Sequence, residues 1–179
     1  MEDLMSELYI FWLTYSILLL FGLVVLRVFV RRDYFWRGRL SVPMSLLQAL
    51  LFFIYGGFPY LYLSDDWPAI HVVAPFHFLG MVFIILGLAC HSYGMFRLGV
   101  TRSVGHGEQI LAHTGIYRRT RNPQALAGGL YVIGFSMLWP SWQALAWAML
   151  YFVLIHIMIL SEEQHLLKIH GTMYEEYCQ

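Results

Sequence analysis

The sequence predicts a single-domain, all-α integral membrane protein with five transmembrane helices, the last two forming a tight hairpin. The 179-residue chain is 59% hydrophobic and 12% charged, with a mean hydropathy of +0.61, whereas a soluble domain is about half apolar and about a quarter charged. Long apolar runs follow one another, several of them near the ~20 residues that cross a bilayer. All eleven Lys and Arg residues fall into three places outside the centres of these runs.

The first part of the domain, residues 1–96, contains three apolar runs that predict three spans. Pro43 suits the first turn of the second span, because its fixed φ and missing N–H have no cost there. A polar stretch, Arg97–Gln124, follows the third span. The three predicted spans are Leu8–Val30, Pro43–Leu63 and Pro75–Phe96.

The second part, residues 97–179, predicts a helical hairpin and a tail. The runs Ala125–Trp139 and Trp142–Leu160 are separated by two residues, so the chain must return tightly through the membrane. The tail Glu162–Tyr177 predicts a short interfacial helix interrupted at Gly171. Two glycine pairs, Gly56–Gly57 and Gly128–Gly129, are expected to let helices pack closely.

The positions of the basic residues predict the orientation of the chain. Arginines cluster in the ranges Arg27–Arg39 and Arg97–Arg121, and Lys168 lies near the C-terminus. Cytoplasmic loops carry the excess of Lys and Arg, so we expect an outside N-terminus and a cytosolic C-terminus. A compact five-span chain favours a bacterial inner membrane.

Charge and cysteine content exclude several classes of function. The net charge of +0 provides no basic field for nucleic acid. Two cysteines, Cys90 and Cys178, are too few for a disulfide framework. Glu162 and His165 have the spacing found in di-iron helices, but such sites need a second copy and two further Glu residues. We therefore expect neither a nucleic-acid partner nor a metal.

Two polar segments on the cytosolic side are candidates for chemistry. The turn Arg121-Asn122-Pro123 leads into a helix, whose N-terminus has spare N–H donors for an anionic or polar group. The alternative is a basic loop that binds lipid headgroups. Glu162 and Glu163, at the end of the last span, are either a solvated helix end or carboxylates that receive a cationic group. The hairpin brings both segments to one membrane face.

The order of several motifs resembles the integral-membrane methyltransferase superfamily, which includes isoprenylcysteine carboxyl methyltransferases and phospholipid N-methyltransferases. The resemblance covers the chain from Phe96 onward and implies an S-adenosyl-L-methionine site on the cytosolic membrane face. The motifs are Leu111, Gly115-Ile116-Tyr117-Arg118, Arg121-Asn122-Pro123, a hydrophobic hairpin, Glu162-Glu163-x-x-Leu166 and Gly171-x-x-Tyr174-x-x-Tyr177.

The resemblance also implies roles for individual residues. The segment before Tyr117 would contact the cofactor largely through its backbone, and the first Glu of the pair would bind it directly. Arg121 and Glu163 would be catalytic, by polarising or deprotonating the acceptor. The cofactor-binding residues would be Gln109, Ile110, Leu111, Ala112, Tyr117, Asn122, Pro123, Gln124, Ala125 and Glu162.

Three positions depart from the superfamily pattern. Ala125 stands where an aromatic residue is usual, Ala127 replaces a glycine, and Met158 replaces the arginine that carboxyl methyltransferases place one turn before Glu162. The sequence therefore favours methyl transfer to a lipophilic acceptor such as an amine or thiol. The alternatives are a prenylcysteine carboxyl methyltransferase, a non-catalytic membrane scaffold with the same fold, and a reductase that uses a nicotinamide cofactor.

Overall fold

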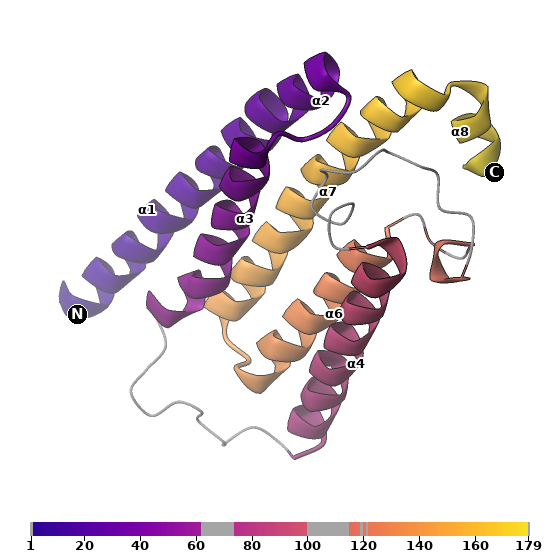
Figure 1. The fold of residues 1–179 in the computed structure, drawn as a ribbon. Helices are drawn as coiled ribbons and strands as arrows, with labels where there is room; N and C mark the ends of the chain where they lie inside the picture. The colour runs from indigo at the N-terminus through magenta and orange to yellow at the C-terminus, as the bar shows by residue number, and fades with distance from the viewer. Residues whose placement is uncertain (1, 62–73, 100–114, 119, 121, 179) are drawn as a thin grey trace.

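The computed structural model describes residues 2–61, 74–99, 115–118, 120 and 122–178, and all regular structure within them is helical (Figure 1). The predicted all-α class is therefore confirmed. In chain order the elements are α1 (Glu2–Val24), a π-helical segment (Val25–Val30), α2 (Arg31–Arg37), α3 (Val42–Gly57), a 3₁₀ turn (Phe58–Leu61), α4 (Ala74–Leu98), a 3₁₀ turn (Gly115–Arg118), α6 (Pro123–Leu138), α7 (Trp142–His170) and α8 (Thr172–Tyr177).

Within the described part of the chain, four helical stretches are long and apolar enough to cross a membrane. They are Met5–Arg37, Val42–Leu61, Pro75–Arg97 and Trp142–His170. The fifth apolar helix, α6, has 16 residues and is about 24 Å long at 1.5 Å per residue. This is shorter than the ~30 Å hydrocarbon core of a bilayer.

The tail is organised differently from the prediction. We expected a separate helix from Glu162, but α7 continues without a break from Trp142 to His170. The interruption at Gly171 is confirmed: this residue has a φ of 52°, and α8 follows it. Because the 29 residues of α7 extend about 43 Å, its C-terminal turns carry Glu162 and Glu163 on a rigid helix rather than on a loose tail.

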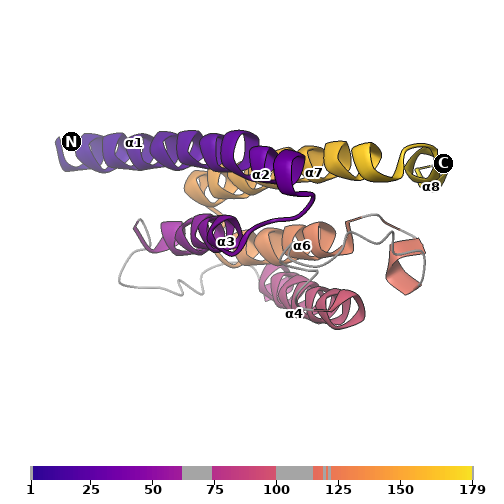
Figure 2. The same cartoon turned by 45° about the horizontal axis from the view of Figure 1, so that its top comes forward.

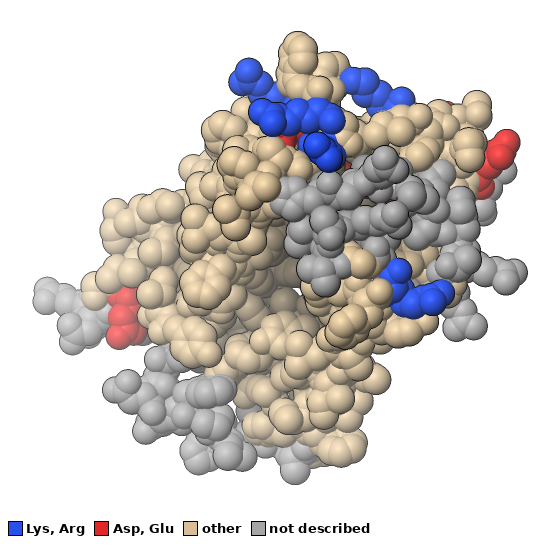
Figure 3. Space-filling model, in the orientation of Figure 1, with Lys and Arg blue, Asp and Glu red and all other residues tan. Residues whose placement is uncertain are grey.

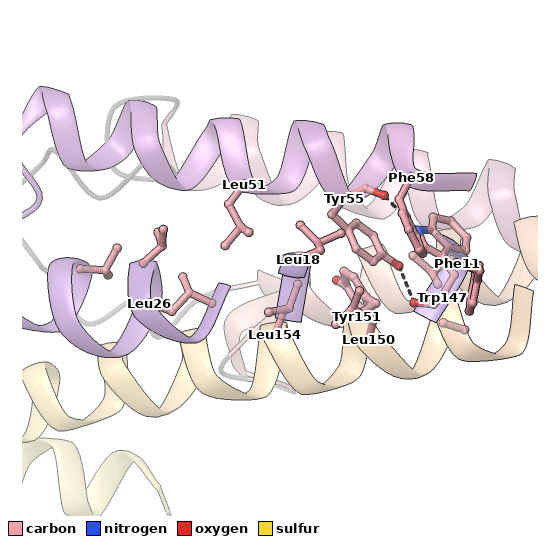
Figure 4. Close-up of a cluster of buried hydrophobic side chains, with 14 of the residues drawn as sticks. Phe11, Leu18, Leu26, Leu51, Tyr55, Phe58, Trp147, Leu150, Tyr151 and Leu154 are labelled. Atoms are coloured by element: carbon pink, nitrogen blue, oxygen red, sulfur yellow. Dashed lines mark hydrogen bonds between the residues drawn. The ribbon is translucent and has the colours of Figure 1, made fainter. Parts of the chain in front are cut away.

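The helices lie in layers, which are visible when the molecule is turned (Figure 2). α1 and α7 form one layer, α3 and α6 the next, and α4 lies outermost against α6. The buried core lies mainly between α1, α3 and α7 (Figure 4).

A reciprocal pair of hydrogen bonds joins α3 to α7 within this core. Tyr55 Oη donates to the Trp147 carbonyl at 3.1 Å, and Trp147 Nε1 donates to the Tyr55 carbonyl at 3.0 Å. The two rings stack with centroids 5.1 Å apart. Both polar side-chain groups are thereby satisfied away from water, which a helix pair in hydrocarbon requires.

Close contact between α4 and α6 depends on small residues. A Cβ added at Gly80 would lie 2.8 Å from the Gly134 carbonyl oxygen, and one at Gly87 would lie 2.7 Å from the Ala127 carbonyl oxygen. Small residues are the usual means by which membrane helices bring their backbones together. Gly80 and Gly87 are seven residues apart, so they lie on the same face of α4.

The expectation for the two glycine pairs is half right. A Cβ at Gly128 would collide with the Tyr151 hydroxyl, and one at Gly129 would lie 3.3 Å from the Phe152 ring. This pair therefore brings α6 and α7 together. The expectation for Gly56–Gly57 is wrong, since no described atom lies within 4 Å of a Cβ at either residue.

Candidate functional site

The candidate site is centred on Tyr117, in the 3₁₀ turn Gly115–Arg118. Gly115 begins this turn with a φ of +66°, a conformation that glycine adopts without steric cost. Tyr117 is 8% exposed, and its hydroxyl is buried without a hydrogen-bond partner among the described residues. A buried polar group left in this state costs about 1–3 kcal/mol, so the position suits a ligand that supplies the missing bond.

Electrostatics connect Tyr117 to the end of α7. Burial raises the pKa of the Tyr117 phenol above its usual value, and the charges of Tyr177 and Glu162 raise this pKa further. Glu162 thus acts on this phenol electrostatically, although the two residues are far apart in the sequence. That the turn and the glutamate form one site stays a prediction.

Gly94 makes room for the site on α4. A Cβ at Gly94 would lie 3.2 Å from Gln124 Cγ and 4.0 Å from Tyr117 Oη. Gly94 follows Gly87 by another seven residues, so it belongs to the same surface of α4 that packs on α6. The helix contact that holds α4 against α6 thus also positions Gln124 beside Tyr117.

The N-terminus of α6 contributes backbone donors. Pro123 occupies its first turn, and the Leu126 N–H donates to the Asn122 carbonyl at 3.1 Å. The Asn122 side chain does not cap the helix. Helix geometry leaves the N–H groups of Gln124 and Ala125 without intrahelical partners, and such groups favour a carboxylate or another anion.

The C-terminal part of α7 is fixed against α1. Ser161 is buried, and its Oγ donates to the Ile157 carbonyl at 3.0 Å and lies 3.3 Å from the Leu26 carbonyl in the π-helical segment. This contact sets the rotation of α7 and leaves Glu162 and Glu163 half-buried. Two adjacent half-buried carboxylates make this end of the helix a strong site for a cationic group.

The last helix closes against the turn that carries Tyr117. Gly171 separates α7 from α8 and lets the chain change direction. Tyr174 is buried, and Tyr177 Oη donates to the Tyr117 carbonyl at 2.8 Å. The tail therefore contributes directly to the position of Tyr117.

The structure describes six of the ten predicted cofactor-binding residues. Tyr117 and Gln124, the latter in the first turn of α6, both lie beside Gly94, and Glu162 acts on the Tyr117 phenol electrostatically. Gln109–Ala112 and Arg121 lie outside the described residues.

Sequence reasoning missed Gly94 altogether. The seven-residue spacing of glycines along α4 is the signal that would have pointed to Gly94. Tyr177 was recognised as part of the tail motif but was given no role of its own, because its partner is a carbonyl on a distant turn.

Metal ligands are not gathered in the described part of the chain. No group of three His, Cys, Asp or Glu side chains is placed there to hold an ion.

Comparisons with known proteins give one match. A family model described as phospholipid methyltransferase matches residues 75–173, which is more than half of the chain. The matched region contains the turn with Tyr117, the start of α6, and Glu162, whereas α1 to α3 lie before it. Comparisons with curated proteins and with solved structures return no match.

Proposed function

The chain belongs to the phospholipid methyltransferase family, and from this membership we propose that it transfers a methyl group from S-adenosyl-L-methionine to a lipophilic acceptor at the membrane. The observations that support the proposal are that Tyr117 and Gln124 both lie beside Gly94 on α4, and that Glu162, near the end of α7, acts on the Tyr117 phenol electrostatically. Tyr117, Gln124 and Glu162 each have a polar group suited to a different part of the cofactor.

The residues present fit this cofactor. The Glu162 carboxylate suits the ammonium group of its amino acid portion, and the N-terminal backbone of α6 at Gln124 and Ala125 suits the carboxylate of that portion. The Tyr117 hydroxyl, which has no hydrogen-bond partner among the described residues, suits a further polar atom. When bound, S-adenosyl-L-methionine would supply an electrophilic methyl group on a sulfonium centre.

The remaining assignments complete the proposed site. Gln109–Ala112 contact the cofactor through backbone groups, and Asn122 and Pro123 shape the entry to α6. Arg121 polarises the acceptor, and Glu163 accepts its proton. Direct displacement of a methyl group needs alignment above all, and alignment contributes up to about 7–11 kcal/mol in favourable cases.

The proposed membrane arrangement follows from charge. The described Lys and Arg side chains seen in Figure 3 gather over α2, the end of α7 and the end of α4. These ends lie on one side of the bundle (Figure 1), which supports five spans, with α6 and α7 as a hairpin and the cofactor site facing the cytosol. The acceptor enters from the bilayer, while the cofactor enters from the water of a bacterial cytosol.

The surroundings of Met158 favour an uncharged acceptor group, such as an amine or a thiol. Gln48 Nε2 donates to Met158 Sδ at 3.3 Å, and Gln48 Oε1 is buried without a partner among the described residues. An amide oxygen of this kind accepts a hydrogen bond from an N–H or S–H group. A substrate carboxylate would instead need a cation, so the prenylcysteine carboxyl methyltransferase reading has less support.

Titration of S-adenosyl-L-methionine into the detergent-purified protein by calorimetry tests the proposal. We expect saturable binding, weakened more than tenfold by Glu162→Gln, which removes the negative charge that holds the ammonium. Glu175→Gln is the matched control, because Glu175 is an exposed carboxylate on α8. We expect this control to bind within about twofold of the wild type, since exposed charges contribute little.

The outcomes separate the candidate functions. Binding that is unaffected by Glu162→Gln would refute the assigned site. A folded wild-type protein that binds no S-adenosyl-L-methionine but binds a reduced nicotinamide would identify a reductase. Binding of neither would favour a non-catalytic scaffold.

A further inference from the structure

A cavity lies where α2 meets the C-terminal part of α7, and Glu162 does not line it. It has a volume of about 190 Å³, below the roughly 300–1,000 Å³ of a pocket for a drug-sized molecule. It therefore suits a small polar group rather than a whole cofactor. Its lining residues are Arg31, Tyr34, Phe35, Ser161, Gln164, His165 and Lys168.

The charged groups of this cavity are both cationic. Lys168 Nζ donates to the Phe35 carbonyl at 3.2 Å and lies 3.6 Å from the centroid of the Phe35 ring. These two contacts hold the ammonium group in place against Phe35. Arg31 is exposed and forms no ion pair with any described residue.

Among the described residues that line the cavity, none carries a carboxylate. The nearby Asp33 accepts hydrogen bonds from the Ser41 N–H and Oγ at 2.6 and 2.7 Å and pairs with Arg37 at 3.0 Å. Glu162 adjoins Ser161 in sequence, but it is not among the lining residues. The two cations are thus the only charged side chains among the described residues that line the cavity.

His165 adds an uncharged acceptor to the cavity. The side chain is 5% exposed, and its Nε2 lies 3.0 Å from the Gly38 carbonyl. Because a carbonyl only accepts, Nε2 carries the proton, and Nδ1 of the neutral ring is left with a lone pair. Nδ1 is buried without a partner among the described residues, and the Tyr34 ring stacks on the imidazole at 4.7 Å, so the ring cannot turn freely.

We propose that this cavity binds the headgroup of an anionic phospholipid that carries a hydroxyl, such as a phosphoglycerol headgroup. The phosphodiester lies between Arg31 and Lys168, and a headgroup hydroxyl donates to His165 Nδ1. A lipid, rather than a soluble phosphate, is favoured by the surroundings. The exposed apolar residue Val28 lies about one helical turn before Arg31, on the membrane side, where acyl chains would run.

This inference does not rest on the proposed methyl transfer. The cavity is built by α2 and α7, and neither Glu162 nor Glu163 lines it. Arg31, Tyr34 and Phe35 also precede the region that matches the family model. A lipid bound here would hold α2 against α7 whether or not the chain is an enzyme.

Calorimetric titration of short-chain lipids into the protein in an uncharged detergent tests the proposal. The probes are dihexanoyl phosphatidylglycerol, dihexanoyl phosphatidylcholine, dihexanoyl phosphatidylethanol and glycerol 3-phosphate. We expect saturable binding of phosphatidylglycerol, with Arg31→Gln and Lys168→Gln each weakening it at least fivefold. Arg39→Gln is the matched control, because it removes an equally exposed arginine of the same cluster that does not line the cavity.

Four results would overturn parts or all of this proposal. Equal weakening by Arg39→Gln would indicate a diffuse surface charge effect instead of a site. Equal binding of phosphatidylcholine would rule out selection for anionic lipid. Equal binding of glycerol 3-phosphate would identify a soluble phosphate as the ligand. Equal binding of phosphatidylethanol, which is anionic but lacks the hydroxyl, would remove the role of His165, whereas several-fold weaker binding is expected from the loss of one hydrogen bond.

Lys168→Arg tests whether weaker binding by Lys168→Gln results only from a loss of folding. It keeps the charge and the contact with the Phe35 ring, so we expect binding within about threefold of the wild type. If Lys168→Arg folds but binds as weakly as Lys168→Gln, the charge at this position is not what holds the headgroup, and the assignment fails.

Discussion

Replacing Gly87 with alanine adds one methyl group at a point of very close approach between α4 and α6. An ideal Cβ there lies 2.7 Å from the Ala127 carbonyl oxygen and 2.8 Å from the Tyr131 nitrogen. Both atoms belong to the backbone of a helix, so no side-chain rotation relieves the overlap. Ordinary contact begins near 3.4 Å, and the two helices must therefore separate locally by about 0.7 Å.

A matched control separates the two effects of this substitution on the free energy of unfolding. Overpacking of this kind costs about 1–3 kcal/mol, while alanine recovers up to about 1 kcal/mol of helix propensity over glycine. Gly56→Ala in α3 gains helix propensity without overpacking, because no described atom lies within 4 Å of its Cβ. The difference in unfolding free energy between the two variants should therefore be about 1–3 kcal/mol.

Unfolding in mixed micelles, followed by circular dichroism, measures this difference. Gly87→Ala is expected to unfold at a lower fraction of denaturing detergent than the wild type, and Gly56→Ala at the same or a higher fraction. If the unfolding free energies of the two variants differ by less than about 0.5 kcal/mol, the typical error in comparing separate sites, the close approach of α4 and α6 is refuted.

Three further predictions follow from single hydrogen bonds and one pKa. Tyr55→Phe removes the bond to the Trp147 carbonyl and should lower the unfolding free energy by about 0.6–1.7 kcal/mol in the same assay; no change would contradict the pairing. Tyr177→Phe removes the bond to the Tyr117 carbonyl and should weaken S-adenosyl-L-methionine binding about two- to tenfold by calorimetry, whereas unchanged affinity would show that α8 does not position the site. Because the folded pKa of Tyr117 is raised, its contribution to stability is present below its ordinary pKa of about 10 and is lost as the pH rises through the folded value. Tyr117→Phe should therefore lose less stability than the wild type in an alkaline titration, and equal losses would contradict the burial of this phenol.

The positions of the four long apolar helices are predictable because bilayer thickness imposes a length on each apolar run. Pro43 in the first turn of α3 and the break at Gly171 are likewise local, since each depends on the backbone of one residue. The continuation of α7 past Ser161 is not determined by the local sequence. Glu162 and Glu163 are compatible with either a helix or a polar tail, and the packing of Ser161 on Leu26 favours the helix.

The partners of each helix are hard to predict for a different reason. A membrane helix is apolar on all sides, so its composition does not show which side faces protein and which faces lipid. The adjacent pair Gly56–Gly57 is conspicuous in the sequence, but no described atom lies within 4 Å of a Cβ added at either residue, whereas glycines seven residues apart define a single face. Gly94 in the site follows from that spacing, and only the packed structure shows its contact with Gln124 and Tyr117.

The core and the candidate site occupy different parts of the bundle, and this separation gives the two kinds of variant different signatures. Tyr55 and Trp147 stabilise the contact between α3 and α7, whereas Gly87 sets the distance between α4 and α6, on which Gln124 depends. Tyr55→Phe should therefore lower stability while leaving S-adenosyl-L-methionine affinity unchanged. Gly87→Ala should lower both, because a shift of about 0.7 Å at α4 moves Gly94 away from Tyr117. If both variants lose affinity in proportion to stability, then binding follows the folded fraction alone, and the local geometry at Gly94 does not contribute to the site.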